Sequence, residues 1–76
     1  MTLVRISDES FLQLLVADML DADDLIAEVL GDDIVEFDLL GSYGIDEMTV
    51  AMELRLRAWE TAQRARGLDV SLKILD

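Results

Sequence analysis

The side chains in this sequence that can do chemistry are almost all carboxylates. Seventeen of the 76 residues are Asp or Glu, and the chain has no cysteine and no histidine. Thiolate nucleophiles, disulfides, Cys/His zinc sites and the usual neutral-pH general base are therefore excluded. Two carboxylates act as an acid/base pair only where apolar burial separates their pKa values, and no pair here has such a setting in the sequence. We therefore expect a protein that is not an enzyme.

Five aspartates lie close together in sequence and offer oxygen ligands to a hard cation such as Ca²⁺ or Mg²⁺. No EF-hand spacing organises them, which favours solvated loop and helix-cap residues over a metal site. They are Asp21, Asp23, Asp24, Asp32 and Asp33. We expect no bound metal.

The charge of the chain limits its partners. Six basic residues against seventeen acidic ones give a formal net charge of -11, which repels nucleic acid and anionic membranes and attracts a protein with a basic surface. An acidic mimic that blocks a nucleic-acid-binding site is a minor alternative. No apolar run approaches the roughly 20 residues of a membrane span, and the first ten residues lack a signal-peptide layout. A cytoplasmic location is expected.

The elements that position these side chains are predicted to be helical in the first half of the chain. Hydrophobic residues make up 53% of the sequence and aromatic residues only 5%, a mixture that suits helices. Capping signals predict one helix over Asp8–Leu20 and a second over Asp21–Leu30, with a single continuous helix as the open alternative. Gly31 is expected to be a left-handed C-cap, and Asp32–Gly44 a loop.

The second half shows the clearest helical pattern in the sequence. Asp46 is predicted to cap a helix over Glu47–Arg66, which Gly67 ends. The tail Leu68–Leu75 alternates apolar and polar residues, which favours a strand, and Thr2–Ile6 is similar. Two strands would pair as a small ribbon, whereas the alternative for the tail is a short final helix.

The predicted helix over residues 47–66 has a wide apolar face that must pack on something. Its members are Met48, Ala51, Met52, Leu54, Ala58, Trp59 and Ala62. Four arginines give the same helix a mildly basic half, which favours pairing with the acidic N-terminal half of the chain. The same asymmetry is compatible with a head-to-tail dimer.

The segment Asp38–Met48, which reads DLLGSYGIDEM, resembles the motif of acyl and peptidyl carrier proteins, whose typical form is DLLESGIIDSM. The register is ungapped. Leu39 and Leu40 match the apolar pair of the family's first loop, and Gly44–Asp46 matches the residues before its modified serine. Met48 matches the apolar residue that follows the serine.

The resemblance implies a site for a phosphopantetheine arm, which the family attaches to a serine at the start of its second helix. Glu47 stands at that position and cannot form the phosphodiester link, so no cofactor is expected. Ser42, in the preceding loop, is the fallback attachment residue if phosphopantetheine is carried at all. The resemblance also implies a partner-binding surface over residues 43–54. Its members are Tyr43, Asp46, Glu47, Met48, Met52 and Glu53.

Together these observations predict one domain over residues 1–76. Its expected fold is all-α, a three- to four-helix bundle similar to an acyl carrier protein, with short extended termini as an option. Its expected role is that of a non-catalytic, carrier-like partner in a polyketide, nonribosomal peptide or fatty-acid type of biosynthesis. The alternative is an acidic helical interaction or oligomerisation module unrelated to carriers, and a homodimer is compatible with both.

Overall fold

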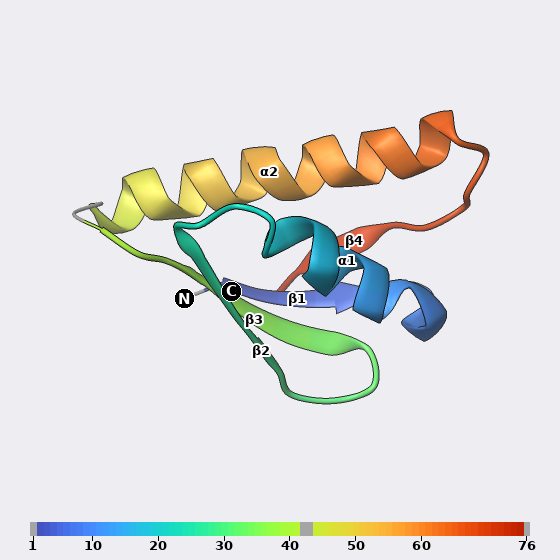
Figure 1. Cartoon of the computed structure of the whole chain (residues 1–76), viewed down its shortest axis with the longest axis horizontal. Helices are drawn as coiled ribbons and strands as arrows, with labels where there is room; N and C mark the ends of the chain where they lie inside the picture. Colours follow the sequence, from blue (N-terminus) through green and yellow to red (C-terminus); the bar gives the residue numbers. More distant parts are fainter. Residues whose placement is uncertain (1, 42–43, 76) are drawn as a thin grey trace.

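The polypeptide forms an antiparallel sheet with two helices packed on one side of it (Figure 1). The computed structural model describes residues 2–41 and 44–75. In chain order the elements are β1 (Thr2–Ile6), the 3-10 turn η1 (Glu9–Phe11), α1 (Leu12–Met19), β2 (Leu25–Val29), β3 (Ile34–Leu39), α2 (Ile45–Ala65) and β4 (Leu72–Ile74).

The expected all-α bundle is wrong because residues 25–39 form a β-hairpin. The segment predicted as a second helix contains β2, and the segment predicted as a loop contains β3. β3 alternates inward Val35, Phe37 and Leu39 with less buried residues between them, which is the period of a half-buried strand. Gly31 is not a left-handed helix cap, since only Gly41 and Gly67 have positive φ among the described glycines.

The four strands run in the order β2-β3-β1-β4, and all neighbours are antiparallel. β1 and β2 are joined through α1 and both pair with β3, so they are parallel to each other with β3 between them. β3 and β4 are joined through α2 and flank β1 in the same way. This is the split βαβ topology of ferredoxin-like domains.

Both chain ends were predicted more accurately than the middle. Of the two alternatives left open for the ends of the chain, the structure has the ribbon, since β1 pairs with β4 through Val4 opposite Ile74 and Ile6 opposite Leu72. The predicted N-terminal helix is present as η1 and α1, where Asp8 accepts hydrogen bonds from the backbone N–H and hydroxyl of Ser10.

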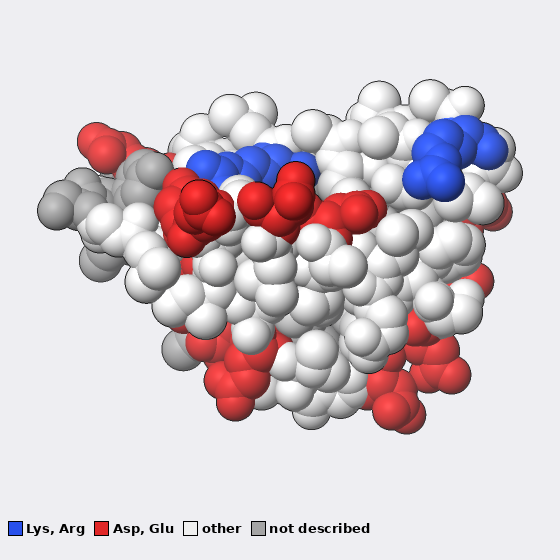
Figure 2. Space-filling view, viewed as in Figure 1, with Lys and Arg blue, Asp and Glu red and all other residues white. Residues whose placement is uncertain are grey.

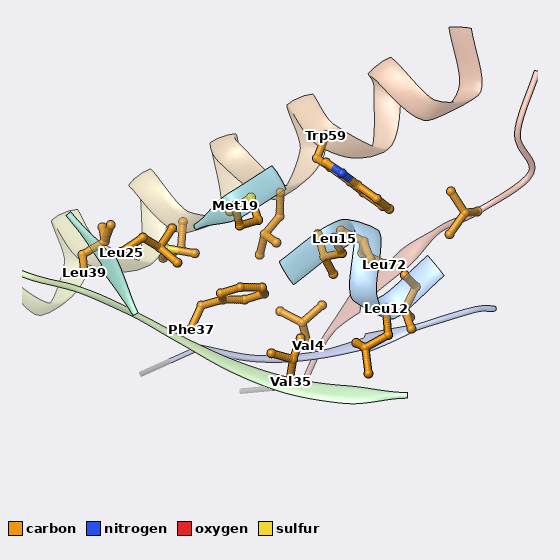
Figure 3. Close-up of a cluster of buried hydrophobic side chains, with 14 residues drawn as sticks. Val4, Leu12, Leu15, Met19, Leu25, Val35, Phe37, Leu39, Trp59 and Leu72 are labelled. Atoms are coloured by element: carbon orange, nitrogen blue, oxygen red, sulfur yellow. The ribbon is translucent and has the colours of Figure 1, made fainter. Parts of the chain in front are cut away.

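The core lies between the sheet and the helices (Figure 3). Phe37 and Val35 of β3 and Val4 of β1 are fully buried beneath side chains from both helices. α1 contributes Leu12, Leu15 and Met19, and α2 contributes Met52, Leu56 and Trp59. The alternate strand residues point to the opposite side of the sheet, which no element covers in the described part of the chain (Figure 1).

The long helix α2 ends where the sequence predicts. Gly67 has φ +82, and the N–H groups of Gly67 and Leu68 donate to the carbonyls of Arg64 and Gln63, both at 3.0 Å. This arrangement satisfies the last carbonyls of the helix and reverses the chain toward β4. Within the described residues no helix is both long and apolar enough to cross a membrane.

Candidate protein interface on α2

The residues predicted for partner binding do not form one surface. Met52 is fully buried in the core, Met48 is half-buried, and Glu47 and Glu53 are exposed. Ser42 and Tyr43 lie outside the described residues, as does the side chain of Asp46. Exposed methionines, the expected sign of a docking surface here, are therefore not found at positions 48 and 52.

The carrier-protein resemblance is overturned by the fold. Asp38 and Leu39 are paired with Ile26 and Leu25 inside the sheet, whereas the carrier motif requires a loop between helices at this point. α2 begins at Ile45, so Glu47 is the third helical residue and does not open the helix. The similarity over residues 38–48 is a local coincidence, and the carrier-like role in biosynthesis is withdrawn with it.

The side of α2 that faces away from the core is apolar. Val50 and Leu54 are 57% and 67% exposed. Three small, exposed residues continue the line at helical spacing toward the C-terminal end. We call this set the outer stripe: Val50, Leu54, Ala58, Thr61 and Ala65. The outward side of a surface helix is ordinarily charged, so this stripe is a surface whose composition calls for an explanation.

The N-terminal part of the outer stripe borders a shallow depression of about 410 Å³. Glu47, Val50, Ala51 and Leu54 line it. Its walls are apolar except for the one carboxylate, which lies in the first turn of α2. A depression of this kind accepts an apolar side chain and offers no set of groups that could activate a substrate.

The charged residues in the middle of α2 lie on its flanks, which leaves the outer stripe from Val50 onward free of them. Both terminal nitrogens of Arg55 lie 2.9 Å from the carboxylate of Asp24, next to β2. Arg57 donates to the carbonyl of Leu72 at 2.9 Å and to Glu60 at 3.1 Å. On the face in Figure 2, the Lys and Arg side chains lie along α2 above a row of acidic residues. The expected pairing of the arginines with the acidic N-terminal half is confirmed for Arg55.

Glu60 joins α2 to the edge of the sheet. Its side chain is 9% exposed, and its Oε2 accepts a hydrogen bond from the backbone N–H of Leu72 at 2.7 Å. The same carboxylate lies 3.1 Å from Arg57 and 3.8 Å from Arg64. These contacts fix the orientation of α2 about its own axis. They therefore determine which of its residues face outward.

α2 is also the neutral part of a strongly acidic chain. Residues 45–66 contain four acidic and four basic residues, so the entire net charge of -11 belongs to the rest of the sequence. A negatively charged molecule that approaches this helix meets less repulsion than at any acidic surface of the domain.

A more polar hollow lies at one end of the sheet and has a volume of about 610 Å³. Ser7 and Ser71 line it together with four carboxylates, those of Asp8, Glu9, Asp33 and Asp69. The two hydrogen bonds from Ser10 hold the pKa of the exposed Asp8 carboxyl below its ordinary value. Among the residues that the structure describes, no group of three or more acidic side chains converges on a point where a metal ion would bind.

Comparison with known proteins returns no match, whether to a protein-family model, a curated protein or a solved structure. The class is therefore defined by architecture alone: a small α/β domain of split βαβ topology. Folds of this kind carry many unrelated functions, so function must be argued from the residues on the surface.

The sequence predicts one apolar face on α2 that includes Leu54 and Ala58 together with Met52 and Trp59. The buried and exposed halves of that face differ only in their angle around the helix.

Proposed function

We propose that this chain is a non-catalytic interaction domain that associates with a second copy of itself through the outer stripe of α2. The observation that carries the proposal is the exposure of Val50 and Leu54 on a helix whose opposite side already fills the core. Burying apolar surface of this kind is favourable by about 25 cal/mol per Å². Packing α2 against the same helix of a second copy is the simplest way to bury the outer stripe.

Side-chain size along the outer stripe favours an antiparallel pair of helices. The larger residues, Val50 and Leu54, lie in the N-terminal half, and the smaller Ala58, Thr61 and Ala65 lie in the C-terminal half. Antiparallel helices place large residues opposite small ones and let the backbones approach closely. A parallel pair would place large against large at one end and leave a gap at the other.

Charge on the flank of the outer stripe favours the same orientation. Glu53 and Arg64 are eleven residues apart, which is about three helical turns, so both lie on the same flank. In an antiparallel dimer the two-fold axis is perpendicular to both helices. This flank of α2 then lies beside the same flank of the partner helix. With the axis next to Ala58, Glu53 lies opposite Arg64 of the partner subunit. Each dimer then gains two such ion pairs.

The test is sedimentation velocity of the full chain from about 10 μM to 1 mM. We expect a concentration-dependent dimer, and we expect Leu54→Glu to raise its dissociation constant at least 30-fold because a buried charge would face the partner helix. Leu20→Glu is the matched control, since Leu20 is 44% exposed and lies at the end of α1. A wild-type chain that stays monomeric at 1 mM contradicts the proposal, as does equal loss in the two variants.

Orientation is tested separately by cross-linking, because the natural chain has no cysteine. In the antiparallel pair Ala58→Cys lies beside its own copy and forms an intersubunit disulfide. Val50→Cys does not, since eight residues on each side of the axis separate the two sulfurs by about 24 Å. Disulfide formation by Val50→Cys would instead indicate a parallel pair, in which every residue of the outer stripe lies beside its own copy. The cytoplasmic location expected from the sequence stays a prediction.

A further inference from the structure

β2 is an edge strand with one side of its backbone open. The N–H of Leu30 donates to the carbonyl of Ile34, and the N–H of Leu40 donates to the carbonyl of Asp24. In the register of this hairpin, the even-numbered residues of β2 therefore form the hydrogen-bonded pairs with β3. The odd-numbered residues between them therefore direct their N–H and C=O groups away from β3. These residues are Leu25, Ala27 and Val29. No other described strand pairs with them.

Apart from the charge of Glu28, this edge lacks the features that usually prevent strand addition. Natural edge strands are short, or carry lysine, proline or a bulge. β2 has five residues with no proline and no basic residue, and Ile26 and Val29 are 49% and 47% exposed. The opposite edge of the sheet is different, since β4 has three residues with Lys73 at their centre. Of the two edges of the described sheet, β2 is the longer and carries the more exposed apolar side chains within the strand.

The uncovered side of the sheet next to β2 carries two facing carboxylates. Glu28 lies directly opposite Glu36 on β3, and like charges in this position repel each other. A strand added beside β2 would place its own side chains next to Glu28, where a lysine or arginine would relieve this repulsion.

We propose that the β2 edge binds an extended segment of a second protein in which basic residues alternate with apolar ones. The backbone of the segment hydrogen-bonds to Leu25, Ala27 and Val29. Its Lys or Arg side chains lie on the uncovered side beside Glu28, and its apolar side chains lie on the helix side beside Val29. A second copy of this chain is a poor occupant, because its own β2 carries Glu28 and no basic residue. The proposal is independent of the dimer through α2.

The experiment uses a fluorescein-labelled peptide of alternating valine and lysine, ten residues long, titrated with the full chain and followed by fluorescence anisotropy. A peptide of the same composition with the five valines and five lysines in separate blocks is the control for charge attraction alone. We expect the alternating peptide to bind at least tenfold more tightly than the block peptide. Equal affinity for the two would overturn the proposal.

Two variants test the backbone and the charge separately. Ala27→Pro removes an outward N–H that makes no bond to β3, so the fold tolerates it while strand addition is blocked. Glu28→Lys keeps the edge open and reverses the charge beside it. We expect each to weaken binding of the alternating peptide at least tenfold, with the tryptophan fluorescence of the folded state unchanged.

Amide hydrogen exchange locates the bound peptide independently of both variants. Saturating peptide should slow exchange at Leu25, Ala27 and Val29 at least fivefold and leave Lys73 on the opposite edge unchanged. Protection at β4 and not at β2, or binding of both variants with wild-type affinity, would show that the peptide binds elsewhere and would contradict the proposal.

Discussion

Glu60 is the residue whose loss should most weaken the attachment of α2 to the sheet. Alanine at this position removes the acceptor for the buried N–H of Leu72 and leaves that donor without a partner. An unpaired buried donor costs about 1–3 kcal/mol. The pairs with Arg57 and Arg64 add less than about 1 kcal/mol, because both arginines are exposed. We therefore expect Glu60→Ala to lower the free energy of unfolding by about 1–4 kcal/mol.

This loss is large for a domain of 76 residues, whose total stability is about 4–11 kcal/mol at the usual value per residue. It corresponds to a fall in Tm of roughly 5–30 °C. Urea denaturation followed by far-ultraviolet circular dichroism measures it at equilibrium, with the single tryptophan, Trp59, as a second probe. Coincident transitions of the two probes would justify a two-state treatment.

Two further variants at and near Glu60 test the reasoning. Glu60→Gln keeps a side-chain oxygen for the N–H of Leu72, so it should cost clearly less than Glu60→Ala. Glu53→Ala changes an exposed carboxylate on the same helix and should stay within about 0.5 kcal/mol of the wild type. A Glu60→Ala protein as stable as Glu53→Ala would refute the argument, and a glutamine variant as unstable as the alanine variant would show that charge and not the acceptor matters.

Three further predictions concern the helices and the surface charge. Asp18→Ala should cost about 1 kcal/mol in urea denaturation because Asp18 accepts a hydrogen bond from the indole N–H of Trp59 at 2.9 Å, whereas Asp21→Ala should cost nothing measurable. Ser10→Ala should raise the pKa of Asp8 in an NMR titration. Because that pKa is lowered by folding, the associated stability is present above the unfolded pKa and lost as pH falls through the folded value. Sedimentation should show stronger self-association at 150 mM than at 10 mM salt, since salt screens the repulsion between two acidic copies.

The hairpin was missed because its residues carry no local signal strong enough to exclude a helix. Ile26 and Val29 continue the three- and four-residue spacing of the preceding helix, and Ala27 and Glu28 suit a helix well. What makes this segment a strand is pairing with β3, which in turn pairs with β1 about thirty residues earlier. Strand identity of this kind depends on tertiary contacts more than on sequence pattern.

The ends of the chain carry local signals, which made a strand one of the two alternatives open for the tail. Gly67 supplies the positive φ that ends α2, and the alternation from Leu68 onward has the period of a strand. The outer stripe was only half predictable. The spacing of Met52, Leu54 and Trp59 showed that α2 is apolar over a wide angle, but a single helix cannot reveal which part of that angle meets the sheet.

Both proposed surfaces follow from one imbalance in the fold. α2 has 21 residues and is about 32 Å long, whereas α1 has 8 residues and is about 12 Å long. The sheet has helices on one side only, so α2 is covered on one side and the β2 edge is not covered at all. The dimer would cover α2 and leave the β2 edge free, so the two sites should not compete. The monomeric Leu54→Glu variant should therefore bind the alternating peptide with the affinity of the wild type, and a change of more than threefold would mean that the two surfaces are coupled.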